Sequence, residues 1–135
     1  TLVADLLAAA PGLRVLRDPT RGGLAATLNE IAQQSGVGMS LDEAALPIRS
    51  EVRGACELLG LDPLNVANEG KLIAICPPEQ ASAALAAMRA HPLGSDAAPV
   101  GQVISHCPHF IGIGPVFGGR RMVDWLSGEQ LPRIC

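Results

Sequence analysis

Apolar residues recur along the chain in two patterns, one with the period of a helix and one of short runs. The first pattern predicts helices over residues 2–10, 18–35, 50–60 and 79–90. Asp18-Pro19 would open the second helix, since Asp can cap a helix and Pro suits its first position. Its apolar face would consist of Leu24, Leu28, Ile31 and Ala32. Ser50 would cap the third helix, whose apolar face would consist of Val52, Ala55, Cys56 and Leu59.

The short apolar runs predict strands at 13–17, 37–41, 71–76, 100–105, 110–117 and 120–124. The run at 71–76 is continuous enough to predict a buried strand. Strands that alternate with helices indicate an α+β domain, in which a mixed sheet is packed with helices. The last eight residues, Gly128 to Cys135, show no period. We therefore predict a domain over 1–127 and a mobile tail over 128–135.

Composition narrows the class of protein. A length of 135 residues suits one domain, and 48% apolar residues with 2% aromatics predict an aliphatic core. The net charge of −3 argues against nucleic acid as a partner. No apolar run approaches the roughly 20 residues of a membrane span, and no secretory signal is visible. The chain opens as if within a helix, so we expect it to be cut from a longer protein.

Four cysteines are present, at positions 56, 76, 107 and 135, and their spacing fits no disulfide framework. A reduced, cytoplasmic setting is therefore expected. Cys56 and Cys76 fall in apolar patterns and are predicted to be core residues. Cys135 differs, because its thiol ends an eight-residue tail that could reach roughly 26 Å. Such a thiolate could carry a group between two sites, or it could be an idle, oxidisable cysteine.

Three stretches of the chain form recognisable motifs. They are Arg17-Asp18-Pro19-Thr20-Arg21-Gly22-Gly23-Leu24, Val66-Ala67-Asn68-Glu69-Gly70-Lys71-Leu72 and the ending Leu131-Pro132-Arg133-Ile134-Cys135. Together they resemble the HypE family of hydrogenase maturation proteins. The two internal motifs are shared more loosely with aminoimidazole ribonucleotide synthetase, selenophosphate synthetase and thiamine-phosphate kinase. The Pro-Arg-Ile-Cys ending is particular to HypE. The resemblance covers nearly the whole chain and implies the fold of the C-terminal domain in that superfamily.

The resemblance implies a function for Cys135. In that family HypF places a carbamoyl group on the terminal cysteine, and ATP is used to dehydrate the S-carboxamide to an S-cyanate. The cyanide then passes to iron held by HypC and HypD. ATP and Mg are bound mainly by an N-terminal domain, which also forms the homodimer and is absent here. This chain alone is therefore expected to be an inactive monomer without its own cofactor, with Pro132, Arg133 and Ile134 as recognition residues.

Two internal segments are the remaining candidates for the chemistry. Glu69 is a candidate base, or a group that orients the amide nitrogen, because partial burial at a strand entrance would suit a carboxylate to that task. The second segment comprises Asp18, Thr20, Arg21, Gly22 and Gly23, whose place before a helix favours a phosphate. Both could instead be structural, one a polar turn and the other a capped helix start that packs through glycine.

Three alternatives stay open at this point. The chain could belong to another ATP-dependent member of the superfamily, such as a selenophosphate synthetase, although such enzymes need no terminal thiol. It could be a non-catalytic docking domain recognised through its tail. His106-Cys107-Pro108-His109 could bind zinc, but the spacing is cramped and no fourth ligand is evident, so we predict no metal site.

Overall fold

The computed structural model describes residues 1–114, 119 and 121–124. These residues form two compact units. Unit 1 comprises Thr1–Arg17 and Leu72–Pro99, and unit 2 comprises Asp18–Lys71 and the described residues from Val100 onward. No helix among the described residues is both long and apolar enough to cross a membrane.

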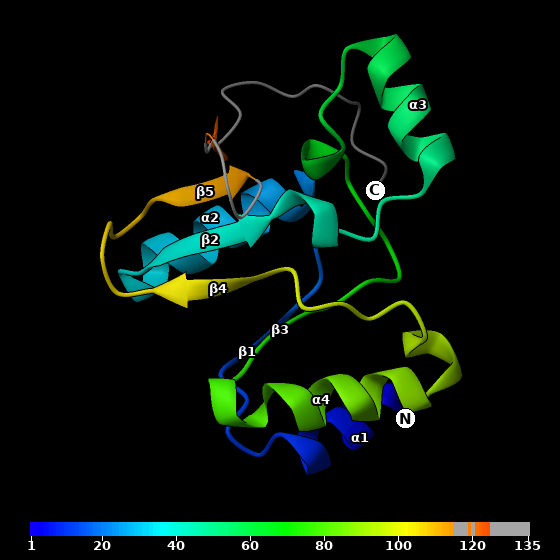
Figure 1. Cartoon of the computed structure of the whole chain (residues 1–135), viewed down its shortest axis with the longest axis vertical. Helices are drawn as coiled ribbons and strands as arrows, with labels where there is room; N and C mark the ends of the chain where they lie inside the picture. The colour runs from blue at the N-terminus through cyan, green and yellow to red at the C-terminus, as the bar shows by residue number, and fades with distance from the viewer. Residues whose placement is uncertain (115–118, 120, 125–135) are drawn as a thin grey trace. The chain divides into compact units, whose positions relative to one another are not determined.

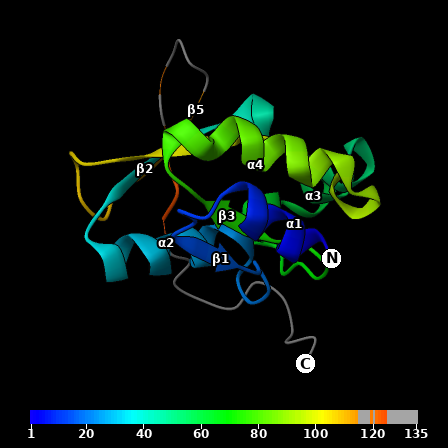
Figure 2. The same ribbon diagram turned by 90° about the horizontal axis from the view of Figure 1, so that it is seen from below.

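Unit 1 is a helix pair with a small sheet. Its helices are α1 (Leu2–Ala9) and α4 (Pro78–Ala90), which lie side by side in Figures 1 and 2. Its strands are β1 (Val15–Arg17) and β3 (Ile73–Ile75), which pair antiparallel. A short 3₁₀ turn, η3 (Pro92–Gly94), follows α4.

The core of unit 1 is built from small and aliphatic side chains. Leu6, Ala10 and Ala84 are buried in it, and the partly buried residues around them are Leu13, Leu16, Leu72, Ala74, Cys76 and Met88. Cys76 packs against this cluster, which confirms its predicted core role, and it is partly buried there. The prediction of a buried strand at 71–76 was wrong, because β3 is only partly buried. A sheet of two strands lacks neighbours to cover it on every side.

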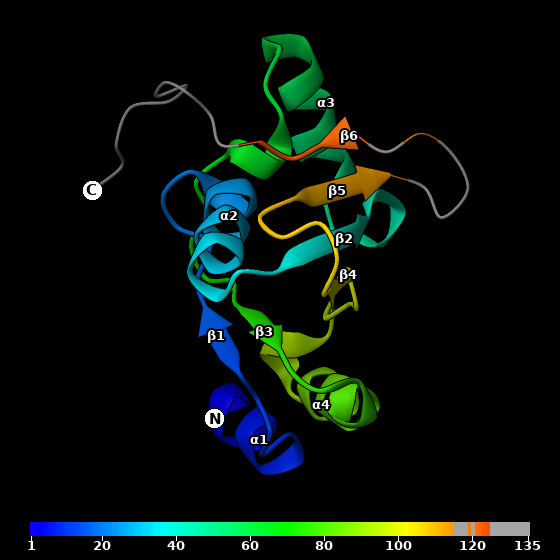
Figure 3. The ribbon, with the colours of Figure 1, turned by 90° about the vertical axis from the view of Figure 1, so that its left-hand side faces the viewer.

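Unit 2 is built on a four-stranded mixed sheet with the order β4-β2-β5-β6, which Figure 3 shows. The strands are β2 (Gly38–Asp42), β4 (Gly101–Ile104), β5 (Ile111–Gly114) and β6 (Arg121–Met122). β2 pairs parallel with β5, and the other two pairings are antiparallel. The helices are α2 (Gly23–Ser35) and α3 (Ser50–Leu59), and the 3₁₀ turns are η1 (Glu43–Ala45) and η2 (Pro63–Asn65).

The core of unit 2 lies between α2 and the sheet (Figures 1 and 3). It contains the buried residues Ala25, Leu28, Ile31, Ala32, Met39, Leu41, Ile111 and Ile113. All of β5 is buried, as expected of a strand in the middle of a sheet. The mixed sheet and its helices confirm the predicted α+β class, with the strands divided between two sheets.

The start of α2 differs from the prediction. The helix begins at Gly23 and not at Asp18-Pro19, and no side chain caps it. Gly22 and Gly23 have φ values of +68° and +64°, so the backbone turns left-handed immediately before the helix. The carbonyl oxygens of Pro19 and Thr20 accept a hydrogen bond from the backbone amide of Asn68, and not from an amide of the next helical turn.

Helix α3 also departs from expectation. Arg49 and not Ser50 occupies the N-cap position, and only Cys56 of the predicted apolar face is buried. Val52 and Leu59 of that face are exposed, as is the neighbouring Leu58. The predicted core role of Cys56 is confirmed, but no element of the described residues covers the rest of that face.

Candidate functional site

The two internal motifs that the sequence marked as candidates meet in unit 2. The backbone amide of Asn68 donates to the carbonyls of Pro19 and Thr20, each at 3.2 Å. The segment 64–71 therefore lies against the segment 18–23, although more than forty residues separate them in the chain. The hydrogen bonds lock the backbone of one motif to the other and place their side chains in one region.

Gly23 is the point of closest approach between the two motifs. A Cβ atom there would lie 2.5 Å from the carbonyl oxygens of both Leu64 and Val66. Only glycine allows the backbone to come this close, and its left-handed φ adds a second reason. The helix start is thus packed against carbonyl oxygens, which favours the structural interpretation of Gly23 over phosphate binding.

The polar side chains of the two motifs remain accessible. Asp18, Arg21 and Glu69 are exposed, and no hydrogen bond or ion pair within the described residues engages their side chains. Lys71 donates from Nζ to Oδ1 of Asn68 at 3.1 Å. Arg21 and Lys71 offer cationic donors and Thr20 a half-buried hydroxyl, which are the groups that bind phosphate. These three side chains are therefore of the chemical type that can hold a phosphate, and their role remains a prediction.

The prediction for Glu69 needs a correction. Its usefulness as a base depended on partial burial, but the side chain is exposed. The reason is local, since Glu69 precedes Gly70, which turns left-handed at φ +71° with open space around it. A surface beyond the described residues would have to cover Glu69 before it could act from a sheltered environment.

Unit 2 also contains a hollow that the sequence did not predict. A hollow of about 370 Å³ lies beside α3, lined by Glu43, Leu46, Ile48, Arg53, Cys56, Glu57, Gly60, Leu61, Asp62, Pro63, Leu64, Ile113 and Arg121. The hollow could not be predicted because its wall combines β5, β6, η1, η2 and α3, which are distant in sequence.

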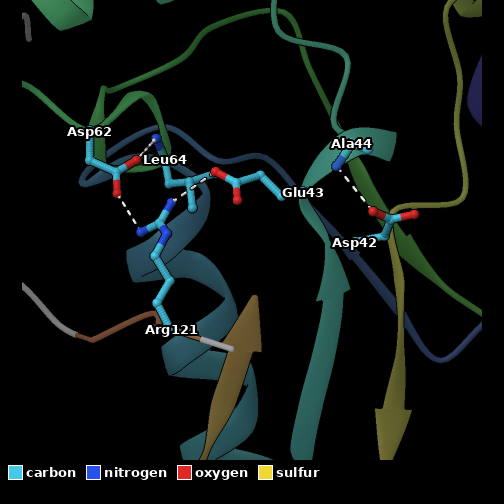
Figure 4. A network of polar contacts seen from close by, with 6 residues as sticks. All are labelled: Asp42, Glu43, Ala44, Asp62, Leu64 and Arg121. Carbon is cyan, nitrogen blue, oxygen red and sulfur yellow. Dashed lines mark hydrogen bonds and ion pairs between the residues drawn. The ribbon is translucent and has the colours of Figure 1, made fainter. Parts of the chain in front are cut away.

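Arg121 ties three of these elements together, as Figure 4 shows. Its guanidinium donates to Oδ2 of Asp62 at 2.8 Å and pairs with Oε1 of Glu43 at 3.5 Å. Partial burial alone would lower the pKa of Arg121. Hydrogen bonds and charge attraction to Asp62 and Glu43 outweigh burial and raise the pKa, so the group stays charged. The other oxygen of Asp62 accepts the Leu64 amide at 2.9 Å and caps η2.

The segment His106-Cys107-Pro108-His109 forms the turn between β4 and β5. Cys107 and His109 have positive φ values of 56° and 64°, and all four residues are exposed. The His109 amide donates to the Val37 carbonyl at 2.9 Å, so the turn is fixed by its backbone. Across the described part of the chain, no group of three or more His, Cys, Asp or Glu side chains is placed to hold a metal ion.

The tail candidates Cys135, Pro132, Arg133 and Ile134 lie outside the described residues. Their roles therefore remain predictions from the sequence.

Comparison with known proteins relates the whole chain to one group. Residues 1–112 match the family described as AIR synthase related protein, C-terminal domain. The chain is 68% identical over 134 residues to carbamoyl dehydratase HypE of Cupriavidus necator, an alignment that covers 99% of this chain and 38% of that protein. It is 66% identical over 134 residues to carbamoyl dehydratase HypE of Azotobacter vinelandii, covering 99% of this chain and 39% of the relative.

Solved structures agree in fold. A crystal structure of hydrogenase maturation protein HypE has a TM-score of 0.91 at 49% identity, covering 99% of this chain and 44% of the other. HypE in complex with ATP has a TM-score of 0.90 at 48% identity, with coverages of 99% and 41%. A HypE–HypF complex has a TM-score of 0.86 at 40% identity, with coverages of 91% and 40%. The chain thus spans less than half the length of these relatives, between 38% and 44%.

Proposed function

The chain belongs to the AIR synthase related proteins, as their C-terminal domain, and from that premise we propose that it is the C-terminal part of a carbamoyl dehydratase of the HypE type. One observation carries this proposal: the 68% identity with a protein of that name extends over 99% of the chain. A selenophosphate synthetase or another member of the superfamily is disfavoured by this identity and by Cys135, for which such chemistry has no use.

In the proposed reaction Cys135 is the carrier. Its thiolate attacks the carbonyl carbon of an activated carbamoyl donor and forms an S–C bond. The bond from that carbon to the donor's leaving group breaks, the leaving group departs with the electron pair, and an S-carboxamide results. ATP supplies a phosphoryl group to the carboxamide oxygen, which turns a poor leaving group into a good one. A base removes the two nitrogen protons as the oxygen departs with phosphate, and Cys135 is left as an S-cyanate.

The interlocked motifs of unit 2 are the proposed place for this step. Arg21, Thr20 and Lys71 are the side chains suited to hold the phosphoryl group, for the reasons of charge and exposure given above. Glu69 lies on the same pair of loops and is proposed as the base or as the group that orients the amide nitrogen. Its exposure is compatible with this role if the preceding part of the longer protein covers it.

The remaining assignments also belong to the proposal. HypF is the proposed carbamoyl donor, which agrees with the complex of a related HypE with HypF. HypC and HypD are the proposed acceptors of the cyanide. The N-terminal part of the longer protein would bind most of ATP, with Mg, and form a homodimer. A cytoplasmic location follows from the need for a reduced thiol at Cys135.

The first test is the intact mass of the full-length protein after reaction with HypF, carbamoyl phosphate and ATP. We expect the mass of one carbamoyl group on Cys135, followed by the loss of one water. Cys135→Ala should show neither change. A carbamoyl group on any other residue, or unchanged dehydration in Cys135→Ala, would overturn the carrier role. The 135-residue chain alone should lose no water, because most of the ATP site would be missing.

Glu69 is tested separately with Glu69→Gln in the full-length protein. The variant should load the carbamoyl group normally and dehydrate it about 100-fold or more slowly, the usual range for loss of a general base. Glu51→Gln is the matched control, since Glu51 is an exposed glutamate on α3 that lies in neither motif. Dehydration by Glu69→Gln at the rate of the control would exclude Glu69 from the chemistry.

A further inference from the structure

Asn68 is held in place where the two interlocked motifs of unit 2 meet. Its backbone amide donates to the carbonyl oxygens of both Pro19 and Thr20, each at 3.2 Å. Its side chain is half-buried, whereas the neighbouring Glu69 is exposed. The fold therefore fixes Asn68, while the turn that follows at Gly70 has open space around it.

The residues that lead to Asn68 are fixed as well. Asp62 accepts the Leu64 amide at 2.9 Å and caps η2, and Leu64 is only 4% exposed. The backbone of residues 64–66 packs against Gly23, where a Cβ atom would lie 2.5 Å from two of its carbonyl oxygens. Packing this close leaves the backbone little room to shift, so the segment presents the Asn68 side chain from a rigid base.

The side-chain amide of Asn68 has a defined orientation. Nζ of Lys71 lies 3.1 Å from Oδ1 of Asn68. A lysine ammonium can only donate, so the atom that faces it must be the amide oxygen. Nδ2 consequently lies on the other side of the amide, and no group in the described part of the chain accepts its N–H bonds.

A fixed donor without a protein partner has a use in the proposed reaction. It can bind an acceptor on a substrate without first breaking a hydrogen bond within the protein. Preorganised donors of this kind stabilise an oxygen atom that gains negative charge in a transition state. Asn68 contacts Lys71, which is proposed to hold the phosphoryl group, so the free donor lies beside the proposed place of the reaction.

We propose that Asn68 is a further catalytic residue, whose Nδ2 donates a hydrogen bond to the carboxamide oxygen as that oxygen departs with phosphate. This inference rests on the proposed function, because it needs a phosphorylated S-carboxamide at the two motifs. After the base has passed the first nitrogen proton to solvent, the second N–H bond breaks and its proton goes to the base. The electron pair of that bond becomes the third bond between carbon and nitrogen. The C–O bond breaks, and its electron pair leaves on the phosphate oxygen, where Nδ2 stabilises the developing charge.

This role differs in its kinetics from that of the nearby cations. Arg21 and Lys71 are exposed and charged, and they attract phosphate both before and after the C–O bond breaks. Their loss should therefore raise the KM for ATP. Nδ2 is a neutral donor whose hydrogen bond strengthens as the oxygen becomes negative. Loss of this donor should lower the kcat of dehydration and leave the KM for ATP nearly unchanged.

The test uses the full-length protein with Asn68→Ala, which removes the donor without adding a charge. Loading of Cys135 by HypF and carbamoyl phosphate should keep its rate, as should the formation of ADP in the first turnover. Loss of water from the loaded thiol should slow by about 100-fold. Mass spectrometry of quenched samples should then show the phosphorylated carboxamide accumulating on Cys135.

Asn68→Asp separates the donor role from a structural one. Aspartate keeps the shape of the side chain and an acceptor for Lys71, but it has no N–H to donate at neutral pH. It should dehydrate as slowly as Asn68→Ala. A normal rate in Asn68→Asp would mean that Asn68 serves only to hold Lys71 through Oδ1, which would overturn the donor role.

Asn65→Ala is the matched control. Asn65 is a half-buried asparagine of the same segment, and its backbone amide donates to the Asp62 carbonyl at 3.0 Å. It lies outside both motifs, and its side chain forms no hydrogen bond with any described residue. This variant should load and dehydrate Cys135 at the rates of the unaltered protein. Equal slowing in Asn65→Ala would show that disturbance of the segment, and not the lost donor, controls the rate.

The outcomes distinguish this inference from the proposed function. If the unaltered protein neither loads Cys135 nor dehydrates it, the proposed function fails, whatever Asn68 does. If it does both, and Asn68→Ala dehydrates at the rate of the control, the donor role is overturned. Equal slowing of ADP formation and water loss would also overturn it, because Asn68 would then act before the oxygen departs. If Asn68→Ala does not fold, Asn68→Asp still decides, since its side chain has the shape of the original.

Discussion

Helices α2 and α3 began as equal predictions from apolar residues at helical spacing, yet they end differently. Both stop at a left-handed glycine, with φ +63° at Gly36 and +66° at Gly60. α2 buries most of its predicted apolar face against the sheet. α3 buries Cys56 and leaves Val52, Leu58 and Leu59 with 44%, 89% and 71% exposure.

The difference lies in what each helix faces. α2 meets the aliphatic face of a four-stranded sheet, whereas the side of α3 that carries Arg53, Cys56 and Glu57 borders a hollow lined by both polar and apolar side chains. α3 is connected to the sheet through Asp62 and its ion pair with Arg121. Apolar residues at helical spacing predict that a helix has an apolar face. They do not predict whether another element covers that face.

The largest contrast should appear when a leucine is truncated on each helix. Leu28→Ala on α2 should lower the free energy of unfolding by roughly 2–5 kcal/mol, because Leu28 is 4% exposed and leaves a cavity. Leu59→Ala on α3 should change it by less than about 0.5 kcal/mol, as for other exposed positions. Chemical denaturation measures both. A comparable loss in Leu59→Ala would show that something covers α3 in solution.

Glycine substitutions should give opposite signs in the two helices. Gly23→Ala should destabilise the chain by about 2 kcal/mol, because alanine is strained at φ +64° and its Cβ would meet the carbonyl oxygens of Leu64 and Val66. Gly54→Ala should stabilise it by about 0.5–1 kcal/mol, since Gly54 lies inside α3 with nothing within 4 Å of the new Cβ.

Thermal unfolding at matched scan rates compares the two glycine variants. Stabilisation by Gly23→Ala would contradict the close contact between the two motifs. Destabilisation by Gly54→Ala would contradict the open surroundings of α3.

The smallest effect concerns the polar contacts near α3. Arg121→Gln should lower the free energy of unfolding by less than about 1 kcal/mol, because the ion pairs are partly exposed and screened by water. The difference from the unaltered protein should shrink further in high salt. Because the pKa of Arg121 is raised in the folded state, its charge contributes at neutral pH and this contribution is lost as the pH rises into strong base. Denaturation in low and high salt measures this, and an effect that grows with salt would contradict it.

Local signals in the sequence were sufficient for much of the fold. The helix ends at Gly36 and Gly60 and the helix over 78–90 follow from residues that lie next to one another in the chain. The start of α2 could not be predicted from the Asp18-Pro19 signal. The capping preference of Asp18 is outweighed by two features of the fold. Gly22 and Gly23 are both left-handed, and the backbone amide of Asn68, which is distant in sequence, binds the carbonyl oxygens of Pro19 and Thr20.

For the candidate site too, some features could be predicted from the sequence and others followed only from the fold. The motifs 17–24 and 66–72 and the ending at Cys135 were recognisable as residue patterns, and with them the family. That Asn68 would bond to Pro19 and Thr20, and that Glu69 would stay exposed, followed only from the fold. The exposure of a side chain depends on surfaces contributed by distant residues, which no local pattern contains.

By itself the sequence determined which residues form most helices, which α+β class they build, and which family they belong to, because these depend on short-range spacing and on motifs read in order. Tertiary structure alone decided that the two motifs interlock through Gly23, that Asn29 holds Val123, and that α3 keeps its apolar face exposed. Each of these is a contact, or a missing cover, between segments far apart in the chain. Such contacts are selected by the packing of the whole unit and not by the preferences of neighbouring residues.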